Sequence, residues 1–237
     1  MIRLLLLTCA LGCAAKHDDY PIGPGGPGGP GGIGGGADAA SDGVAGDGGA
    51  TIDGRVCLTS DLRRLDACSN TAAAGLTVTL GAKTATTDAT GQFSIEMPAG
   101  TNLTWRVTGG AIVTSVEQFS ISRVLVAISE VDYNALGAVI DADKGSMIVR
   151  LVRGGAPLVG ATATVTPNGG TYQPFYDGPS VLAWTQTATG AFGVVWLPDA
   201  AATAQTMTIT PASGSPHTES GIVVEAGAIR FATIDVP

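Results

Sequence analysis

The chain has 237 residues, of which 45% are hydrophobic and 14% charged, and its formal net charge is −8 with a sequence pI of about 4.5. Binding to nucleic acid needs clustered lysines and arginines, so this composition excludes nucleic acid as a partner. The only histidines, His17 and His217, lie in no motif for zinc binding or nucleophilic catalysis. We therefore expect no enzymatic activity, no metal and no other cofactor.

Residues 1–12, MIRLLLLTCALG, predict an export signal. Arg3 supplies the positive charge, and the apolar stretch that follows is shorter than the roughly 20 residues that span a bilayer. The run that ends at Cys13 resembles a bacterial lipobox, in which the signal is removed and the cysteine carries lipid. We expect a lipid anchor on Cys13, and Ala14, which stands where an inner-membrane retention aspartate would be, favours the outer membrane. The alternative is secretion with an ordinary signal that is cut after a nearby alanine.

Residues 13–50 predict a disordered tether that is rich in glycine, proline and aspartate. Its Pro-Gly-Gly triplets break helices and strands, and few apolar side chains are left to offset the entropy of ordering. A flexible chain of this length reaches about 30 to 35 Å on average, which clears a lipid headgroup layer.

The remaining residues contain a repeat. The segment TTDATGQFSIEMP at 86–98 returns as TQTATGAFGVVWLP at 185–198. In each copy an Ala-Thr-Gly turn precedes a strand that begins with phenylalanine, so the alignment equates Phe93 with Phe192. A domain has been duplicated.

Apolar and polar residues alternate within these copies. Leu76, Val78 and Leu80, for example, alternate with threonines, which is typical of strands with one buried and one exposed face. Short alternating runs separated by Gly, Pro, Asn or Asp predict an all-β fold of two tandem Ig-like or prealbumin-like antiparallel β-sandwiches.

The two sandwiches are expected at residues 51–128 and 144–237. Between them, residues 129–143 predict a short helical joint, because Ser129 and Asp132 form a capping box ahead of an apolar run that continues to Ile140.

Cys57 and Cys68 predict a disulfide, because an exported domain folds in an oxidising compartment. A redox pair would need a C-x-x-C spacing, and a metal site would need two further ligands. Arg63 and Arg64, inside the loop that this disulfide would close, are expected to form a small solvated basic knob.

The order Gly54-x-Val56, then AGLTVTL at 74–80, then TDATGQFSI at 87–95 resembles the carboxypeptidase regulatory-like domains, which are transthyretin-like β-sandwiches. The resemblance covers about residues 52–128 and, more loosely, 144–237. It implies an accessory module without catalytic residues. The chain is also similar to collagen-adhesin B-type sandwiches, but it lacks the lysine of their internal Lys-Asn bond in the first strand, so we expect no such bond.

The candidate binding residues are Tyr172, Phe175, Tyr176 and Trp184, which gather in and just after the Gly- and Pro-rich segment 168–179. Aromatic side chains on a loop can stack on sugars or anchor a protein partner. Alternatively, they fold back and cap the core of the second sandwich.

Two functions follow from these alternatives. In the first, an envelope lipoprotein presents two sandwiches as a structural or protein-interaction unit. In the second, the same lipoprotein is a glycan-binding or adhesive module that uses the aromatic segment. Exposed aromatic residues would favour the second function and buried ones the first.

Overall fold

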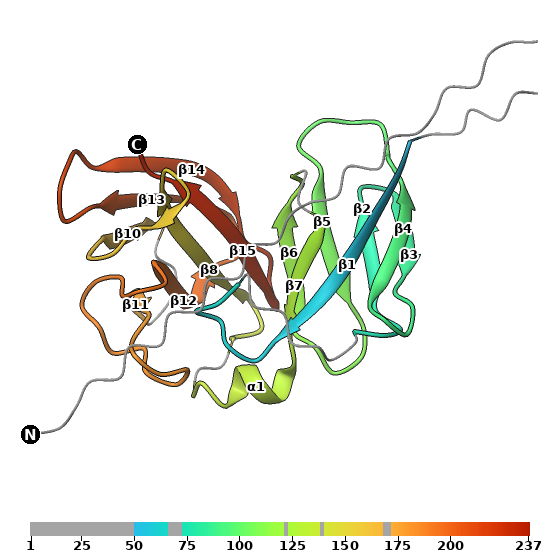
Figure 1. Cartoon of the computed structure of the whole chain (residues 1–237), viewed down its shortest axis with the longest axis horizontal. Coiled ribbons are helices and arrows are strands. Elements are labelled where there is room, and N and C mark those ends of the chain that lie inside the picture. Colours follow the sequence, from blue (N-terminus) through green and yellow to red (C-terminus); the bar gives the residue numbers. More distant parts are fainter. Residues whose placement is uncertain (1–49, 66–72, 121–122, 138–139, 168–171) are drawn as a thin grey trace, which may run out of the picture. The chain divides into compact units, whose positions relative to one another are not determined.

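The computed structural model describes residues 50–65, 73–120, 123–137, 140–167 and 172–237, all of which belong to one compact unit (Figure 1). The predicted signal peptide, Cys13, most of the tether and Cys68 lie outside the described residues.

The first sandwich consists of two sheets with apolar side chains between them. One sheet has the order β4-β1-β7, formed by β1 (Thr51–Thr59), β4 (Gln92–Glu96) and β7 (Val124–Ile128). The other contains β2 (Thr77–Leu80), β3 (Lys83–Thr86), β5 (Thr104–Thr108) and β6 (Thr114–Gln118). The predicted alternation is confirmed, because Val78, Leu80, Phe93 and Ile95 are buried while the polar residues between them are not.

Helix α1 (Glu130–Asn134) begins at the predicted capping box. The Ser129 side chain accepts a hydrogen bond from Asp132 N at 3.0 Å and so satisfies one of the free N–H groups of the first turn. The helix is shorter than predicted, and Gly137, at φ 78°, directs the chain away from it. Tyr133 is the buried residue of this helix and packs against Trp196 with ring centroids 6.0 Å apart.

The second sandwich repeats the strand pairing of the first, so the all-β prediction of two tandem sandwiches is confirmed. Strand β8 pairs with β12 and β15 as β1 pairs with β4 and β7, and β13 pairs with β10 and β14 as β5 pairs with β2 and β6. Its strands are β8 (Lys144–Arg153), β9 (Ala156–Pro157), β10 (Thr162–Thr166), β11 (Phe175–Tyr176), β12 (Val194–Ala201), β13 (Ala204–Thr210), β14 (His217–Val223) and β15 (Ala228–Asp235).

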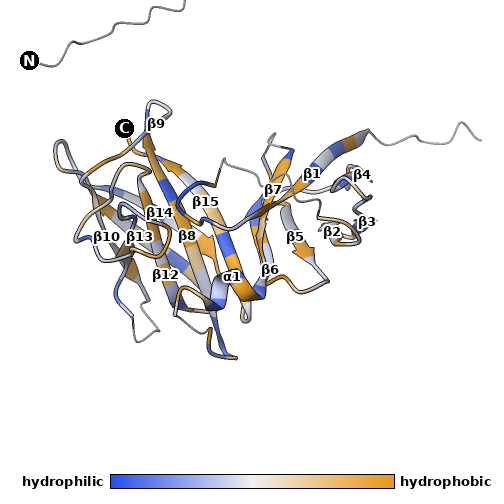
Figure 2. Ribbon diagram, turned by 60° about the horizontal axis from the view of Figure 1, so that its bottom comes forward, coloured by the Kyte–Doolittle hydropathy of each residue, from blue (hydrophilic) through white to orange (hydrophobic). Residues whose placement is uncertain are grey.

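One pairing joins the two sandwiches into a single sheet. Strand β15 runs parallel to β6, from Ala228 opposite Thr114 to Phe231 opposite Glu117. The sheet therefore continues through both sandwiches in the order β11-β12-β8-β15-β6-β5-β2-β3 (Figure 1). Strands such as β1 and β15 carry both apolar and polar residues in Figure 2, as strands between a core and solvent do.

A separate apolar cluster lies at this joint and takes side chains from both sandwiches and from α1. Its buried members are Leu62, Val126, Ile128, Tyr133, Ile148, Trp184, Val194, Trp196, Ile229 and Phe231. Because they share a sheet and a core, the two sandwiches cannot move independently without exposing apolar surface.

Two buried threonines occupy equivalent positions in the repeats. Thr87 Oγ1 accepts a hydrogen bond from Leu76 N at 2.8 Å, and Thr189 Oγ1 accepts one from Ala161 N at the same distance. In return, the backbone N–H of each threonine donates to the carbonyl of the same residue, Leu76 or Ala161. Each threonine therefore fixes the turn to the strand segment that precedes it, and Thr87 is the counterpart of Thr189.

This equivalence corrects the predicted alignment of the repeats. Gly91, at φ 77°, follows its threonine by the same number of residues as Gly193, at φ 68°. The prediction matched Gly91 with Gly190 and was wrong by three residues. Phe192 consequently precedes β12, and the counterpart of Phe93 is Val195.

A carboxylate accepts hydrogen bonds from the backbone of the turn in each repeat, but the two carboxylates stand at different positions in the two repeats. In the first repeat Asp88 Oδ1 accepts hydrogen bonds from Thr90 N at 2.7 Å and Gln92 N at 2.9 Å. In the second repeat the counterpart of Asp88 is Gly190, and the fully buried Asp177 takes over from the preceding segment. Its oxygens accept hydrogen bonds at 2.8 Å from three backbone N–H groups, those of Gly190, Phe192 and Val194.

Candidate functional site

The four candidate aromatic residues lie on the second sandwich, and two of them are buried. Tyr176 belongs to the core, where its hydroxyl accepts from Ala163 N at 2.9 Å and donates to Ala163 O at 3.3 Å. Trp184 is buried at the joint, and its ring centroid lies 5.2 Å from that of Trp196.

The other two candidates are half-buried. The Phe175 ring centroid lies 5.6 Å from that of Trp196, and the Tyr172 centroid lies 5.9 Å from that of Phe175. Phe175 and Trp184 thus pack against Trp196, Tyr172 packs on Phe175, and Tyr176 points into the core instead. The segment serves mainly to cover the second sandwich, so it offers a ligand little aromatic surface.

Arg63 is buried, so the expectation of a solvated basic knob was wrong for this residue. Its guanidinium forms an ion pair with Asp61 at 2.8 Å, donates to Gly178 O at 2.7 Å and lies 5.2 Å from the centre of the Phe192 ring. Burial alone would raise the pKa of Asp61, but the hydrogen bonds and charge of Arg63 outweigh it and lower that pKa. Arg63 therefore joins the segment after β1 to the aromatic segment.

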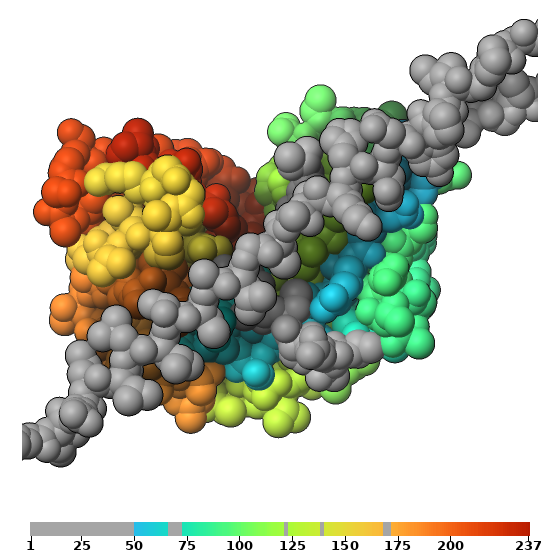
Figure 3. Space-filling model, viewed as in Figure 1, coloured from blue at the N-terminus to red at the C-terminus, as the bar shows by residue number. Residues whose placement is uncertain are grey.

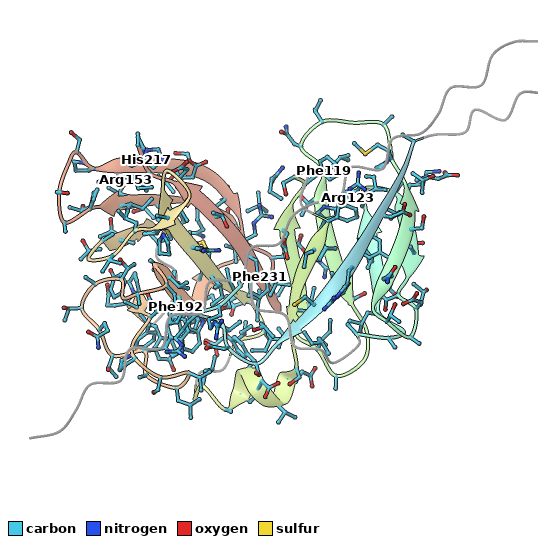
Figure 4. The ribbon with its side chains drawn as sticks, viewed as in Figure 1. Phe119, Arg123, Arg153, Phe192, His217 and Phe231 are labelled. Atoms are coloured by element: carbon cyan, nitrogen blue, oxygen red, sulfur yellow. The ribbon has the colours of Figure 1, made fainter. Side chains whose placement is uncertain are left out.

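A large opening lies beside the strand pair that joins the sandwiches. The β6–β15 ladder stops at Phe231 and Glu117, after which β15 continues to Asp235 while β6 ends at Gln118. The strands part there and leave a cavity of about 810 Å³, which we call the cleft. Figure 3 shows the hollow between the green strands of the first sandwich and the red strands of the second. In Figure 4 Phe231 lies where the sandwiches meet and Phe119 lies on the side of the first.

Arg230 of β15 is the most unusual side chain of the cleft. It is 4% exposed, and burial lowers the pKa of its guanidinium. Nη2 donates to Gln118 Oε1 at 3.2 Å, but Nε and Nη1 are buried without a hydrogen-bond partner in the described structure. Buried donors of this kind are rare in folded proteins and call for an explanation.

Glu117 of β6 lies in the same cleft. Burial raises the pKa of its carboxyl to about 7, against the opposing effects of a hydrogen bond from Val126 N and the charge of Arg230. That hydrogen bond, to Oε1, is 2.6 Å long, and Glu117 forms no ion pair with Arg230. The other charged residues lining the cleft are Arg150 of β8 and Glu219 of β14, whose carboxylate lies 3.5 Å from His217 Nε2.

Sequence reasoning missed both Arg230 and Glu117. Arg230 interrupts the apolar run from Ala228 to Ala232, and a charged residue inside such a run is a signal that could have singled it out. Nothing in the sequence brings β6 and β15 together, so Glu117 carried no comparable signal.

Across the described ranges, no group of three or more His, Cys, Asp or Glu side chains could hold a metal ion. In the same ranges, no helix is long and apolar enough to cross a membrane. Cys57 is buried on β1, but with Cys68 outside those ranges the disulfide stays a prediction, as does the lipidation of Cys13.

No protein-family model matches the chain, and no curated protein matches it. Three solved structures show a distant likeness. A type II cohesin–X-dockerin complex from Acetivibrio cellulolyticus is 22% identical over 33% of this chain and 52% of its own, with a TM-score of 0.23. The Bacillus anthracis TIE protein is 14% identical over 78% of this chain and 33% of its own, with a TM-score of 0.24.

The minor pilin of Streptococcus agalactiae is 11% identical over 79% of this chain and 96% of its own, with a TM-score of 0.26. This chain thus spans about half the length of the first matched structure and a third of the second. At these identities and TM-scores, the likenesses carry no argument about function.

Proposed function

We propose that this protein is a non-enzymatic lipoprotein of the bacterial cell envelope, in which two carboxypeptidase regulatory-like sandwiches form a structural or protein-interaction unit. The observation that carries the proposal is the β6–β15 pairing, which makes one sheet of two sandwiches. A unit of this kind holds its surfaces at a fixed spacing. Preorganised surfaces bind a partner with less loss of conformational entropy than mobile ones do.

The cleft is the surface that we assign to the partner. Its walls come from both sandwiches, so it exists only while they are joined. The burial of Tyr176 and Trp184 favours this assignment over glycan binding through the aromatic segment.

The lipid anchor is tested at Cys13. In cells labelled with palmitate, we expect the native protein to take up label and to sediment with membranes. Cys13→Ala should abolish both, since two or more acyl chains are needed for stable attachment. Label that persists in Cys13→Ala would refute the anchor.

The interaction role is tested with a photo-crosslinking residue in cells that produce the protein. Val124 lines the cleft and is 44% exposed, whereas Val159 is 58% exposed and lies outside the cleft lining. We expect a discrete crosslinked protein adduct from position 124 and none from the control position 159. Equal adducts from both positions, or none from position 124, would contradict the proposed role of the cleft.

A further inference from the structure

We propose that the cleft binds an acidic peptide segment, whose carboxylate pairs with Arg230 and whose backbone lies along the open edge of β15. This inference rests on the proposed protein-interaction role and adds the chemistry of the partner. It does not depend on the lipid anchor.

The first argument is the unsatisfied charge of Arg230. A buried guanidinium that lacks acceptors is unfavourable, because its desolvation is not offset by hydrogen bonds. Nε and Nη1 have no acceptor in the described structure, and the acceptor of Nη2 is a neutral amide. A carboxylate that replaced Gln118 on Nη2 would also accept from one of these two unpartnered groups, and it would supply the missing charge.

The second argument concerns access to this guanidinium. Gln118, which donates from Nε2 to Leu103 O and accepts from Arg230, is an exposed side chain at the end of β6. Rotation of this one side chain would break the hydrogen bond to Nη2 and free that donor for a ligand in the cleft. The amide oxygen of Gln118 thus holds the position that a ligand carboxylate would take on Nη2.

The third argument is that no carboxylate of the cleft neutralises Arg230. Glu117 uses Oε1 on Val126 N, and its raised pKa of about 7 leaves it partly protonated near neutral pH. Glu219 faces His217, and Arg150 on the neighbouring strand β8 adds a second arginine to the lining of the cleft. The site therefore keeps a net attraction for an anionic group.

The fourth argument identifies the ligand as an extended peptide. From Ala232 to Asp235, β15 pairs with β8 on one side, and no described strand pairs with its other side, which faces the cleft. Such an edge presents N–H and C=O groups that can pair with an added strand. Val124, which lines the cleft and is 44% exposed, provides an apolar contact for a side chain of that strand.

The test uses a library of short random peptides, selected on the purified native protein and again on Arg230→Met. Peptides that enrich on the native protein alone should contain Asp or Glu at one shared position. Replacing that acid by its amide should weaken binding by about tenfold. Arg230→Met should cause a similar loss, and combining the two changes should weaken binding no further.

Arg106→Met is the matched control, because this arginine lies on β5, one strand beyond β6, and does not line the cleft. It should bind the selected peptides as the native protein does. If Arg230→Met melts lower than the native protein, the comparison of acid and amide peptides on the native protein still decides the question.

Failure to enrich any peptide, selected peptides without a shared acid, or equal binding of acid and amide forms would each overturn the proposal. A crosslinked adduct from position 124 that persists in Arg230→Met would overturn this inference and leave the proposed interaction role standing. Loss of the adduct in Arg230→Met, with the fold intact, is the result we expect.

Discussion

Asp177→Ala is expected to lower the free energy of unfolding by about 4 kcal/mol, because three backbone N–H groups would lose a charged acceptor in a buried site. The loss extends beyond the turn, since Val194 is the first residue of β12, which pairs with the central strand β8. Denaturation in urea, monitored by tryptophan fluorescence, measures the change because Trp184 and Trp196 lie in the adjacent core.

Asp88→Ala provides the matched control for this prediction. Asp88 binds two of the three equivalent N–H groups of the first repeat, but it is exposed, and water can replace its carboxylate. We expect a much smaller loss of stability than for Asp177→Ala. Equal losses would show that the burial of Asp177 does not determine its contribution.

Lowering the pH from 8 to 5 is expected to stabilise the protein through Glu117. Its pKa rises from 4.5 to about 7 in the folded protein, so the folded state binds a proton that the unfolded state does not bind in this range. Stability is therefore greatest below the unfolded pKa and falls as the pH rises through 7. The shift corresponds to at most about 3 kcal/mol between these limits.

Glu117→Gln isolates this effect, because glutamine keeps an oxygen that can accept from Val126 N and carries no charge. The variant should be more stable than the native protein at pH 8 and should lose most of the dependence between pH 5 and 8. Unfolding curves at several pH values measure the dependence. If the stability of Glu117→Gln depended on pH as steeply as that of the native protein, groups other than Glu117 would be responsible for the dependence.

Features that depend on local sequence were predictable. The alternation around Val78 and Phe93 indicated the strands, and the Ser129–Asp132 capping box indicated the start of α1. The repeat was also visible, but its register was not. The letters Ala-Thr-Gly occur in both copies and suggest one alignment. The structurally equivalent threonines are instead Thr87 and Thr189, because each accepts a hydrogen bond from a strand segment far from it in the chain.

Features that depend on contacts between the repeats were beyond sequence reasoning. Arg63 is buried because it contacts Gly178 and Phe192 of the other sandwich. The residues next to it in the chain gave no sign of this burial. Arg230 reaches the cleft because β15 pairs with β6, and its hydrogen bond to Gln118 spans 112 positions of the chain. No periodic pattern encodes a pairing at that separation.

The exchange of Asp88 for Asp177 restricts how the two repeats can evolve. A Cβ atom on Gly190 would lie 2.2 Å from the backbone oxygen of Asp177, so even alanine does not fit there. Restoring an aspartate at Gly190 would also place two carboxylates where three N–H groups accommodate one. Asp177 and Gly190 can therefore not change independently of each other. The second repeat depends on the segment that carries Asp177, whereas the first repeat has no counterpart of that segment in this role.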